Sequence, residues 1–238
     1  MIAAYFPLIG RLGNIMFIYA FARAWCEQNG YELCLDPWIG EKIFQIPEAN
    51  RTRNADKVFP ENYYQDQDSL IYTRRQVREW FKLKPEIEER LQPVLNENRK
   101  RVLCNARWGV DYVSAGNPIV RAAAYEMACA YFGYSMRDIE WEIDTKPTRL
   151  LGFNGDIWGS GQGVTAVALP SFYRLMKAPI LFRANSTFSW WAATLGDGKV
   201  FSPVVKGMKG ECCPNFIEGN WPQMTTSPVN TDLFLRED

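Results

Sequence analysis

A hydroxyl-rich turn placed just before an apolar helix is the segment best suited to bind an anion. Residues 184–196 read ANSTFSWWAATLG. The start of such a helix offers backbone N–H groups, a positive dipole end and side-chain hydroxyls, which together bind a phosphate without a metal. A simpler interpretation makes Ser186 or Thr187 a helix cap and leaves Trp190 and Trp191 in the core. Local chemistry leaves both interpretations open.

A second segment with binding chemistry lies near the N-terminus, where residues 10–14 read GRLGN. Gly10 and Gly13 allow backbone to approach a ligand closely. Arg11 and Asn14 add a charge and hydrogen-bonding groups. A tight turn from a strand into a helix explains both glycines equally well.

Arg107 is the first charged residue after the apolar run 102–106. A guanidinium stays charged and donates hydrogen bonds in pairs, which suits a diphosphate. A surface ion pair, with Asp111 as its partner, is the alternative. Asp111 and Asp36 are also the carboxylates that we consider first as a general base, although each fits a structural role equally well.

Composition excludes several classes of catalyst. The 238 residues contain no histidine, so Ser-His-Asp catalysis, HExxH zinc sites and His-ligated haem are ruled out. Lys and Arg together number 27, as do Asp and Glu, so the net charge is zero. Nothing therefore indicates bulk attraction to nucleic acid or to an anionic membrane.

The chain is expected to be cytoplasmic. No stretch reaches the roughly 18 apolar residues that a bilayer span needs, and the N-terminal residues lack the basic flank of a signal peptide. Peripheral association with a membrane remains compatible with this sequence. The six cysteines form no CxxC pair, which indicates reduced and mostly buried thiols.

Alternation of apolar strands and helices predicts an α/β fold. Asn14 is expected to cap the first helix and Gly30 to end it. The polar run 96–101 is expected to link two lobes. Ligands of such parallel units bind at the carboxyl ends of the strands. The predicted strands are 2–6, 32–35, 102–106, 179–183 and 199–201, and the other predicted helices are 74–95 with breaks at its prolines, 119–132, 170–176 and 187–195.

Three segments, in this order, resemble motifs of glycosyltransferase family 11, the α-1,2-fucosyltransferases. Residues 10–17, GRLGNIMF, are similar to the first motif, and residues 185–193, NSTFSWWAA, reproduce the third without change. Residues 105–113, NARWGVDYV, resemble the second motif, His-x-Arg-Arg-Gly-Asp-Tyr-Val. Here Asn105 stands in place of the histidine and Trp108 in place of the second arginine.

The resemblance implies a GT-B-like α/β fold of two facing Rossmann-type lobes, the first one reduced. Residues 1–98 would form the acceptor side with the glycine loop, and residues 99–238 the nucleotide-sugar lobe. The implied activity is an inverting, metal-independent transfer of fucose or a related sugar from a GDP-sugar to a glycan hydroxyl. No cofactor, metal ligand or nucleic-acid partner is expected.

Residue by residue, the resemblance and the local chemistry give one expected site. Arg107, Asp111 and Asp36 are the expected catalytic residues. The expected donor-binding residues are Arg11, Gly13, Asn14, Asn105, Arg107, Asn185, Ser186, Thr187, Phe188 and Ser189.

Two rival functions stay open. The replacements at Asn105 and Trp108 are compatible with a binding protein that has lost catalysis, and an unrelated α/β enzyme with a chance match is the third reading.

Asp66-Gln67-Asp68 fits the metal-binding DxD pattern of other glycosyltransferases, but it follows no apolar strand and is interpreted as a solvated loop. The glycine-rich run 159–163 is interpreted as a flexible segment rather than a dinucleotide fingerprint.

Overall fold

Two parallel sheets form the framework of the chain. The computed structural model describes residues 2–51, 54–95, 100–107, 120, 122–143, 163–203 and 223–224. The strand orders are β2-β1-β3 in the first sheet and β5-β4-β6-β7-β8 in the second. The strands are β1 (Ala3–Phe6), β2 (Glu32–Leu35), β3 (Lys57–Val58), β4 (Val102–Ala106), β5 (Ile139–Ile143), β6 (Ile180–Phe182), β7 (Lys199–Pro203) and β8 (Gln223–Met224).

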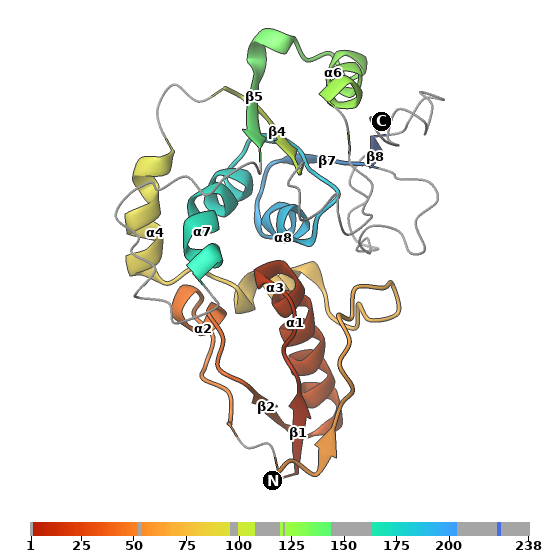
Figure 1. Cartoon of the computed structure of the whole chain (residues 1–238), viewed down its shortest axis with the longest axis vertical. Coiled ribbons are helices and arrows are strands. Elements are labelled where there is room, and N and C mark those ends of the chain that lie inside the picture. The colour runs from red at the N-terminus through yellow and green to blue at the C-terminus, as the bar shows by residue number, and fades with distance from the viewer. Residues whose placement is uncertain are drawn as a thin grey trace.

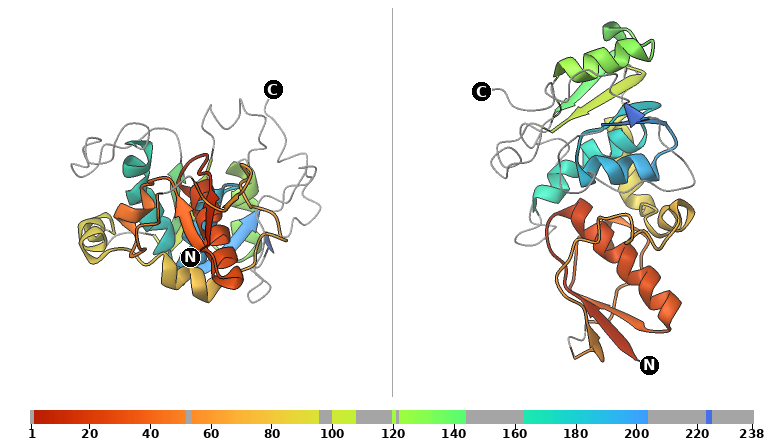
Figure 2. Two further views of the ribbon diagram at one scale, coloured as in Figure 1. Left: turned by 90° about the horizontal axis from the view of Figure 1, so that it is seen from below. Right: turned by 90° about the vertical axis from the view of Figure 1, so that its right-hand side faces the viewer.

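The helices pack along the first sheet, between the two sheets and on the outer side of the second sheet. Figure 1 shows α8 between the two sheets, with α7 beside it and α6 beyond the second sheet, and the right view of Figure 2 gives the same order. The helices are α1 (Leu12–Asn29), α2 (Gly40–Ile43), α3 (Arg74–Trp80), α4 (Pro85–Leu91), α6 (Ala122–Tyr131), α7 (Gly163–Met176) and α8 (Thr187–Leu195), with 3₁₀ turns η1 (Gln92–Val94) and η2 (Met136–Asp138).

The first sheet and α1 form a strand–turn–helix–strand unit, as predicted. β1 pairs in parallel with β2. Gly30 ends α1 in the left-handed conformation, with φ of 70°, as its position predicted. The prediction that Asn14 caps this helix is wrong, because α1 begins at Leu12 and its N-cap is Arg11. Asn14 lies inside the first turn, and its side chain is available for a contact with another element.

The second sheet places β4 between β5 and β6. Cys104 lies opposite Trp141 on one side and Phe182 on the other. The boundaries predicted for 102–106 and for the helix 187–195 are confirmed. β5 was not predicted, because its sequence IEWEI carries two glutamates, and both pair with Arg174 of α7. This pairing allows a charged strand to lie at the edge of the sheet.

The remaining helices differ from prediction mainly in length. The region 74–95 is broken at its prolines into α3, α4 and η1, as expected. α6 lies within the predicted range 119–132. The prediction 170–176 was too short, because α7 begins at Gly163 and carries Pro170 inside it. Tertiary packing therefore overrides the helix-breaking tendency of this proline.

One continuous apolar core joins the two sheets. It contains side chains of β1 and α1 together with α7, α8 and the inner faces of β4, β6 and β7. Phe17 of α1 contacts both tryptophans of α8, with ring centroids 4.6 Å from Trp190 and 4.9 Å from Trp191. A smaller cluster fills the space between α6 and the outer face of the second sheet.

Four cysteines of the described residues, Cys26, Cys34, Cys104 and Cys129, are free and buried, as predicted. Cys212 and Cys213 lie outside the described residues, as do positions 96–99 of the expected linker. None of the helices described is long and apolar enough to cross a membrane.

Candidate anion site at the start of α8

The two glycine- and hydroxyl-containing segments meet in the structure. Thr187 Oγ1, at the start of α8, donates a hydrogen bond of 2.9 Å to Asn14 Oδ1 in the first turn of α1. Gln65 Nε2 donates to the same oxygen at 3.3 Å. Asn14 and Thr187 are 173 positions apart in the sequence, so tertiary folding brings them together.

Gly13 allows α1 to approach the backbone of α8. A Cβ atom at this position would lie 2.8 Å from the backbone nitrogen of Phe188 and 2.9 Å from the carbonyl carbon of Thr187. Trp191 Nε1 also donates a hydrogen bond of 2.9 Å to the carbonyl oxygen of Gly13. Glycine is therefore required here by close approach between two helices.

The serines of the turn have structural partners. Ser186 is the N-cap of α8, and its Oγ accepts a hydrogen bond of 3.2 Å from the backbone nitrogen of Phe188. Ser189 is fully buried and donates to the carbonyl oxygen of Ala184 at 2.9 Å. The simpler interpretation of this segment is therefore confirmed for the cap, and Trp190 and Trp191 are fully buried, as it required.

The electrostatics of this region favour an anion. The N-termini of α1 and α8 converge at the contact between Gly13 and Thr187, and neither helix has an acidic residue in its first turn. Arg11, the N-cap of α1, is exposed and makes no side-chain capping hydrogen bond. Two positive dipole ends would attract a bound anion here, and the guanidinium of Arg11 lies at the start of α1.

Arg107 emerges at the same edge of the sheet as this turn. β4 and β6 are neighbouring parallel strands, with Cys104 opposite Phe182. Arg107 and Asn185 therefore follow the carboxyl ends of two adjacent strands. Arg107 is partly exposed, whereas Asn185 is buried. The carboxyl edge of a parallel sheet is where ligands of such folds bind.

Asn105 has a structural partner within the sheet. Its side chain is buried, and Nδ2 donates a hydrogen bond of 3.1 Å to the carbonyl oxygen of Glu142 on β5. Its own carbonyl oxygen accepts from Tyr125 Oη at 2.7 Å. These bonds join β4 to β5 and to α6.

Of the two carboxylates expected to act as a base, the structure describes Asp36, and Asp111 lies outside the described residues. Asp36 follows β2 at the carboxyl edge of the first sheet, and its Oδ2 accepts a hydrogen bond of 2.6 Å from Tyr5 Oη. This hydrogen bond joins β1 to the residue that follows β2.

The sequence motifs did not predict the buried contacts of Arg183 or the contact of Gln65 with Asn14. Arg183 leaves the end of β6 and is only 2% exposed. Its Nε donates to Ser202 Oγ at 2.7 Å and its Nη1 to the carbonyl oxygen of Ala184 at 3.1 Å. The sequence signal available for Arg183 was the position of a charged residue between an apolar strand and the NSTF turn. For Gln65, which contacts Asn14 across 51 positions, no local signal exists.

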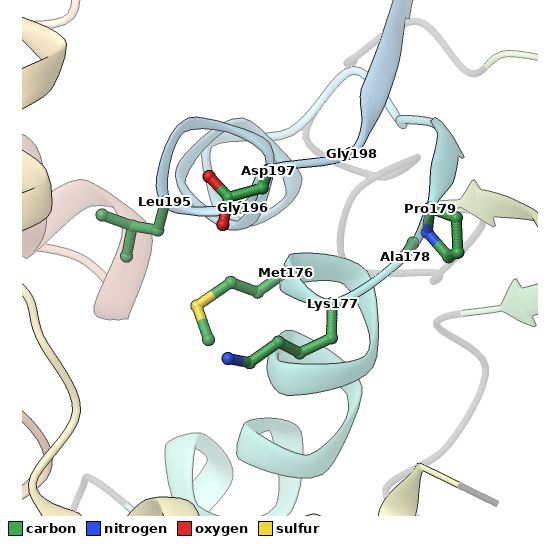
Figure 3. Close-up of a pocket in the computed structure, with 8 residues that line it drawn as sticks. All are labelled: Met176, Lys177, Ala178, Pro179, Leu195, Gly196, Asp197 and Gly198. Atoms are coloured by element: carbon green, nitrogen blue, oxygen red, sulfur yellow. The ribbon is translucent and has the colours of Figure 1, made fainter. Parts of the chain in front are cut away.

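Residues 66–68 form a turn, and residues 159–162 of the glycine-rich run lie outside the described residues. Asp66, Gln67 and Asp68 are exposed, and Asp66 Oδ1 accepts hydrogen bonds of 2.8 Å from the backbone nitrogen and hydroxyl of Ser69, which confirms a solvated turn. A pocket of about 310 Å³ lies at the opposite end of α8 (Figure 3). It is lined by Met176, Lys177, Ala178, Pro179, Leu195, Gly196, Asp197 and Gly198.

Comparisons with known proteins identify the fold. The sequence gives no match to models of protein families or to curated proteins. The structure resembles a crystal structure of NodZ α-1,6-fucosyltransferase soaked with GDP-fucose, with a TM-score of 0.50 and 11% identity, over 82% of this chain and 93% of that one. For fucosyltransferase NodZ from Bradyrhizobium, the TM-score is 0.52 and the identity 13%, over 82% and 94% of the two chains. The chain thus has a fucosyltransferase-like α/β fold, and this likeness does not point to the α-1,2 family specifically.

Proposed function

We propose that the chain is a glycosyltransferase that moves fucose, or a related sugar, from a GDP-sugar to a glycan hydroxyl. In this proposal the two sheets are the two lobes of a GT-B enzyme, divided near residues 98 and 99. The reaction inverts the anomeric carbon and needs no metal.

The convergence of the two helix N-termini is the observation that carries the proposal. Thr187 is bonded to Asn14 and Gly13 packs on Phe188, so the motif segments of α1 and α8 meet where two helix N-termini come together. A nucleotide diphosphate carries the negative charge that helix N-termini attract, and backbone N–H groups at helix starts bind phosphate oxygens. The NodZ structure soaked with GDP-fucose supports a GDP-sugar as the ligand class.

Stabilisation of the leaving group would supply most of the rate. As the bond to the sugar breaks, negative charge grows on the GDP diphosphate and positive charge on the sugar ring. Arg107 would neutralise the diphosphate with paired hydrogen bonds. Arg11, Gly13, Asn14 and residues 185–189 would bind the same donor, and Asp36 or Asp111 would accept the proton of the acceptor hydroxyl.

The proposal also concerns the glycosidic linkage that the enzyme forms. The resemblance of the sequence motifs implies an α-1,2 linkage, whereas the NodZ neighbour is an α-1,6-fucosyltransferase. Methylation analysis of the glycan product distinguishes the two linkages. Turnover that persists in excess EDTA would support the metal-independent mechanism.

A binding protein without turnover is the second candidate. The observation that favours it is Asn105, which replaces the motif histidine and uses its side chain to hold β4 on β5. Calorimetry with GDP, followed by a donor-hydrolysis and transfer assay, separates the candidates. Binding without turnover across GDP-fucose, GDP-mannose, UDP-sugars and dTDP-sugars would favour the binding protein.

Arg107→Ala tests the proposed donor site. Because hydrogen bonds to a charged group contribute about 1.5–3 kcal/mol, we expect GDP affinity to fall roughly 10- to 100-fold. Arg107 is partly exposed, so the thermal unfolding midpoint should change little. Arg101→Ala is the matched control, since Arg101 is exposed at the opposite end of β4. Equal GDP affinity of wild type and Arg107→Ala would refute the proposed site.

A further inference from the structure

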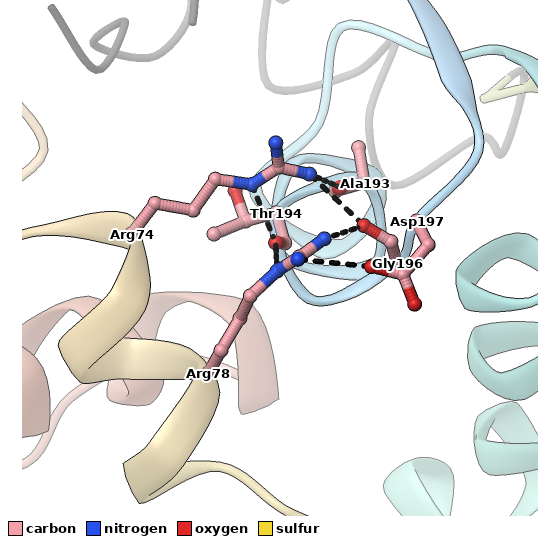
Figure 4. Close-up of polar contacts among 6 residues, drawn as sticks. All are labelled: Arg74, Arg78, Ala193, Thr194, Gly196 and Asp197. Atoms are coloured by element: carbon pink, nitrogen blue, oxygen red, sulfur yellow. Dashed lines mark hydrogen bonds and ion pairs between the residues drawn. The ribbon is translucent and has the colours of Figure 1, made fainter. Parts of the chain in front are cut away.

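Two arginines of α3 bind the carboxyl end of α8. Arg74 donates from Nε to the carbonyl oxygen of Thr194 at 3.0 Å, and from Nη2 to the carbonyl oxygens of Ala193 and Gly196 at 3.3 and 2.9 Å. Arg78 donates from Nε to Thr194 at 3.0 Å and from Nη2 to Gly196. Figure 4 shows both guanidinium groups directed at this last turn.

These arginine side chains replace the partners that usually bond the last carbonyl groups of a helix. The last carbonyl groups of a helix lack partners within it, and commonly a glycine in the left-handed conformation serves them. Gly196 instead has φ of −80° and ψ of 166°, and α8 has no basic residue of its own in its last turn. The carbonyl groups therefore depend on side chains 116 to 122 positions earlier in the chain.

The two arginines are costly to place together. They stand four residues apart on one face of α3, where like charges repel. Burial, and then the charge of Arg78, lower the pKa of Arg74. Arg78 pairs with Asp197 at 2.9 Å, but Asp197 has 92% of its side chain exposed, so this ion pair contributes little. The carbonyl contacts, supported by the negative end of the helix dipole, offset the cost.

α8 connects these arginines to the anion site. It has nine residues and is therefore about 13 Å long. Its first residue contacts Asn14, the indole of Trp191 binds Gly13, and its last turn is held by α3. Every one of these partners precedes residue 96, so the first part of the chain fixes α8 at both ends.

We propose that Arg74 and Arg78 are positioning residues that set the orientation of α8, and thereby the alignment of its first turn with Gly13 and Asn14. The role in donor transfer rests on the proposed function. A shift of about 1 Å in a reacting group can reduce a rate by about two orders of magnitude, so small rotations of α8 would be costly.

The test compares Arg74→Gln/Arg78→Gln with Arg75→Gln. Arg75 lies on the same helix and is exposed, so its variant shows the effect of replacing one arginine of α3 that does not bind α8 in the described contacts. We expect kcat with GDP-fucose to fall about 10- to 100-fold in the double variant at a temperature where it is fully folded. Arg74→Lys/Arg78→Lys keeps the charges but loses the planar forks, so it should recover part of kcat. A role in stability alone would lower the unfolding midpoint and leave kcat unchanged.

Hydrogen exchange supplies a readout that is independent of activity. The amide of Trp190, bonded to the carbonyl oxygen of Ser186 at 3.0 Å, should exchange faster in the double variant than in Arg75→Gln. If wild type neither binds nor uses a GDP-sugar, but exchange at Trp190 still rises, the proposed function fails and the positioning role stands. Faster exchange confined to residues 193–197, with unchanged exchange at Trp190, would overturn the positioning role.

Discussion

Gly13 is the residue through which α1 packs closely on α8 in the proposed site. A methyl group there would meet backbone atoms of α8, and backbone can move only by shifting the helix. A substitution here should therefore affect stability and, if the proposed site is correct, donor binding as well. The glycine, which by sequence fits a turn or a ligand contact equally well, is explained by the close packing of α1 on α8.

Gly13→Ala should lower both stability and donor affinity. Inserting a methyl group into a tightly packed contact costs about 1–3 kcal/mol, measurable by guanidinium unfolding. Gly133→Ala is the control, because Gly133 has φ of 81° with no atom within 4 Å of an added Cβ. Its backbone strain costs about 1–2 kcal/mol without touching the site. Gly13→Ala with wild-type stability would contradict the close packing described here.

α8 is the element on which the proposed site depends. Its first turn carries the motif hydroxyls, its middle carries two buried tryptophans, and its last turn is held by arginines of α3. The segment NSTFSWWAA therefore has two structural roles. The serine and threonine residues form the turn, and the tryptophans attach that turn to α1.

Trp191→Phe tests the attachment of α8 to α1. The variant keeps an aromatic ring in the core but removes the N–H that donates to the carbonyl oxygen of Gly13. Leaving a buried carbonyl oxygen without this partner should cost about 1–3 kcal/mol of unfolding free energy. Urea unfolding monitored by circular dichroism measures the loss. A difference below about 0.5 kcal/mol would show that the hydrogen bond does not hold α8.

At the scale of the whole molecule, charge and thiol chemistry set the pH dependence of stability. The chain contains no histidine, so no imidazole titrates near pH 6.5. Burial, followed by the effects of Cys34 and Glu27, raises the pKa of Cys26 to about 12 from its ordinary value of 9.0. Burial also raises the pKa of Cys34.

Stability should therefore be nearly constant from pH 6 to 8 and fall above pH 9. Because the pKa of Cys26 is raised in the folded state, the thiol ionises first in the unfolded chain. The contribution of this thiol to the free energy of unfolding is therefore complete below about pH 9 and is lost as the pH rises toward 12. Unfolding by guanidinium under reducing conditions, between pH 7 and 10.5, measures this loss. Cys26→Ala should show a shallower decline, and equal slopes for the two proteins would contradict the buried thiol as the cause.

The sequence by itself determined the local features of the chain. Strands 32–35 and 102–106, helix 187–195 and the end of α1 at Gly30 follow from short apolar runs, a serine cap and a left-handed glycine, all of which act over a few residues. The absence of histidine likewise excluded imidazole chemistry without any coordinates. The segments proposed to bind a donor were also found at this level.

Tertiary structure decided which of these segments meet. The contact of Asn14 with Thr187 and the binding of Arg74 and Arg78 to α8 join residues more than a hundred positions apart. No local pattern specifies such contacts, because they result from packing the shared core between the sheets. Asn14, expected as a cap, lies inside α1, and its side chain instead accepts a hydrogen bond from Thr187 of α8.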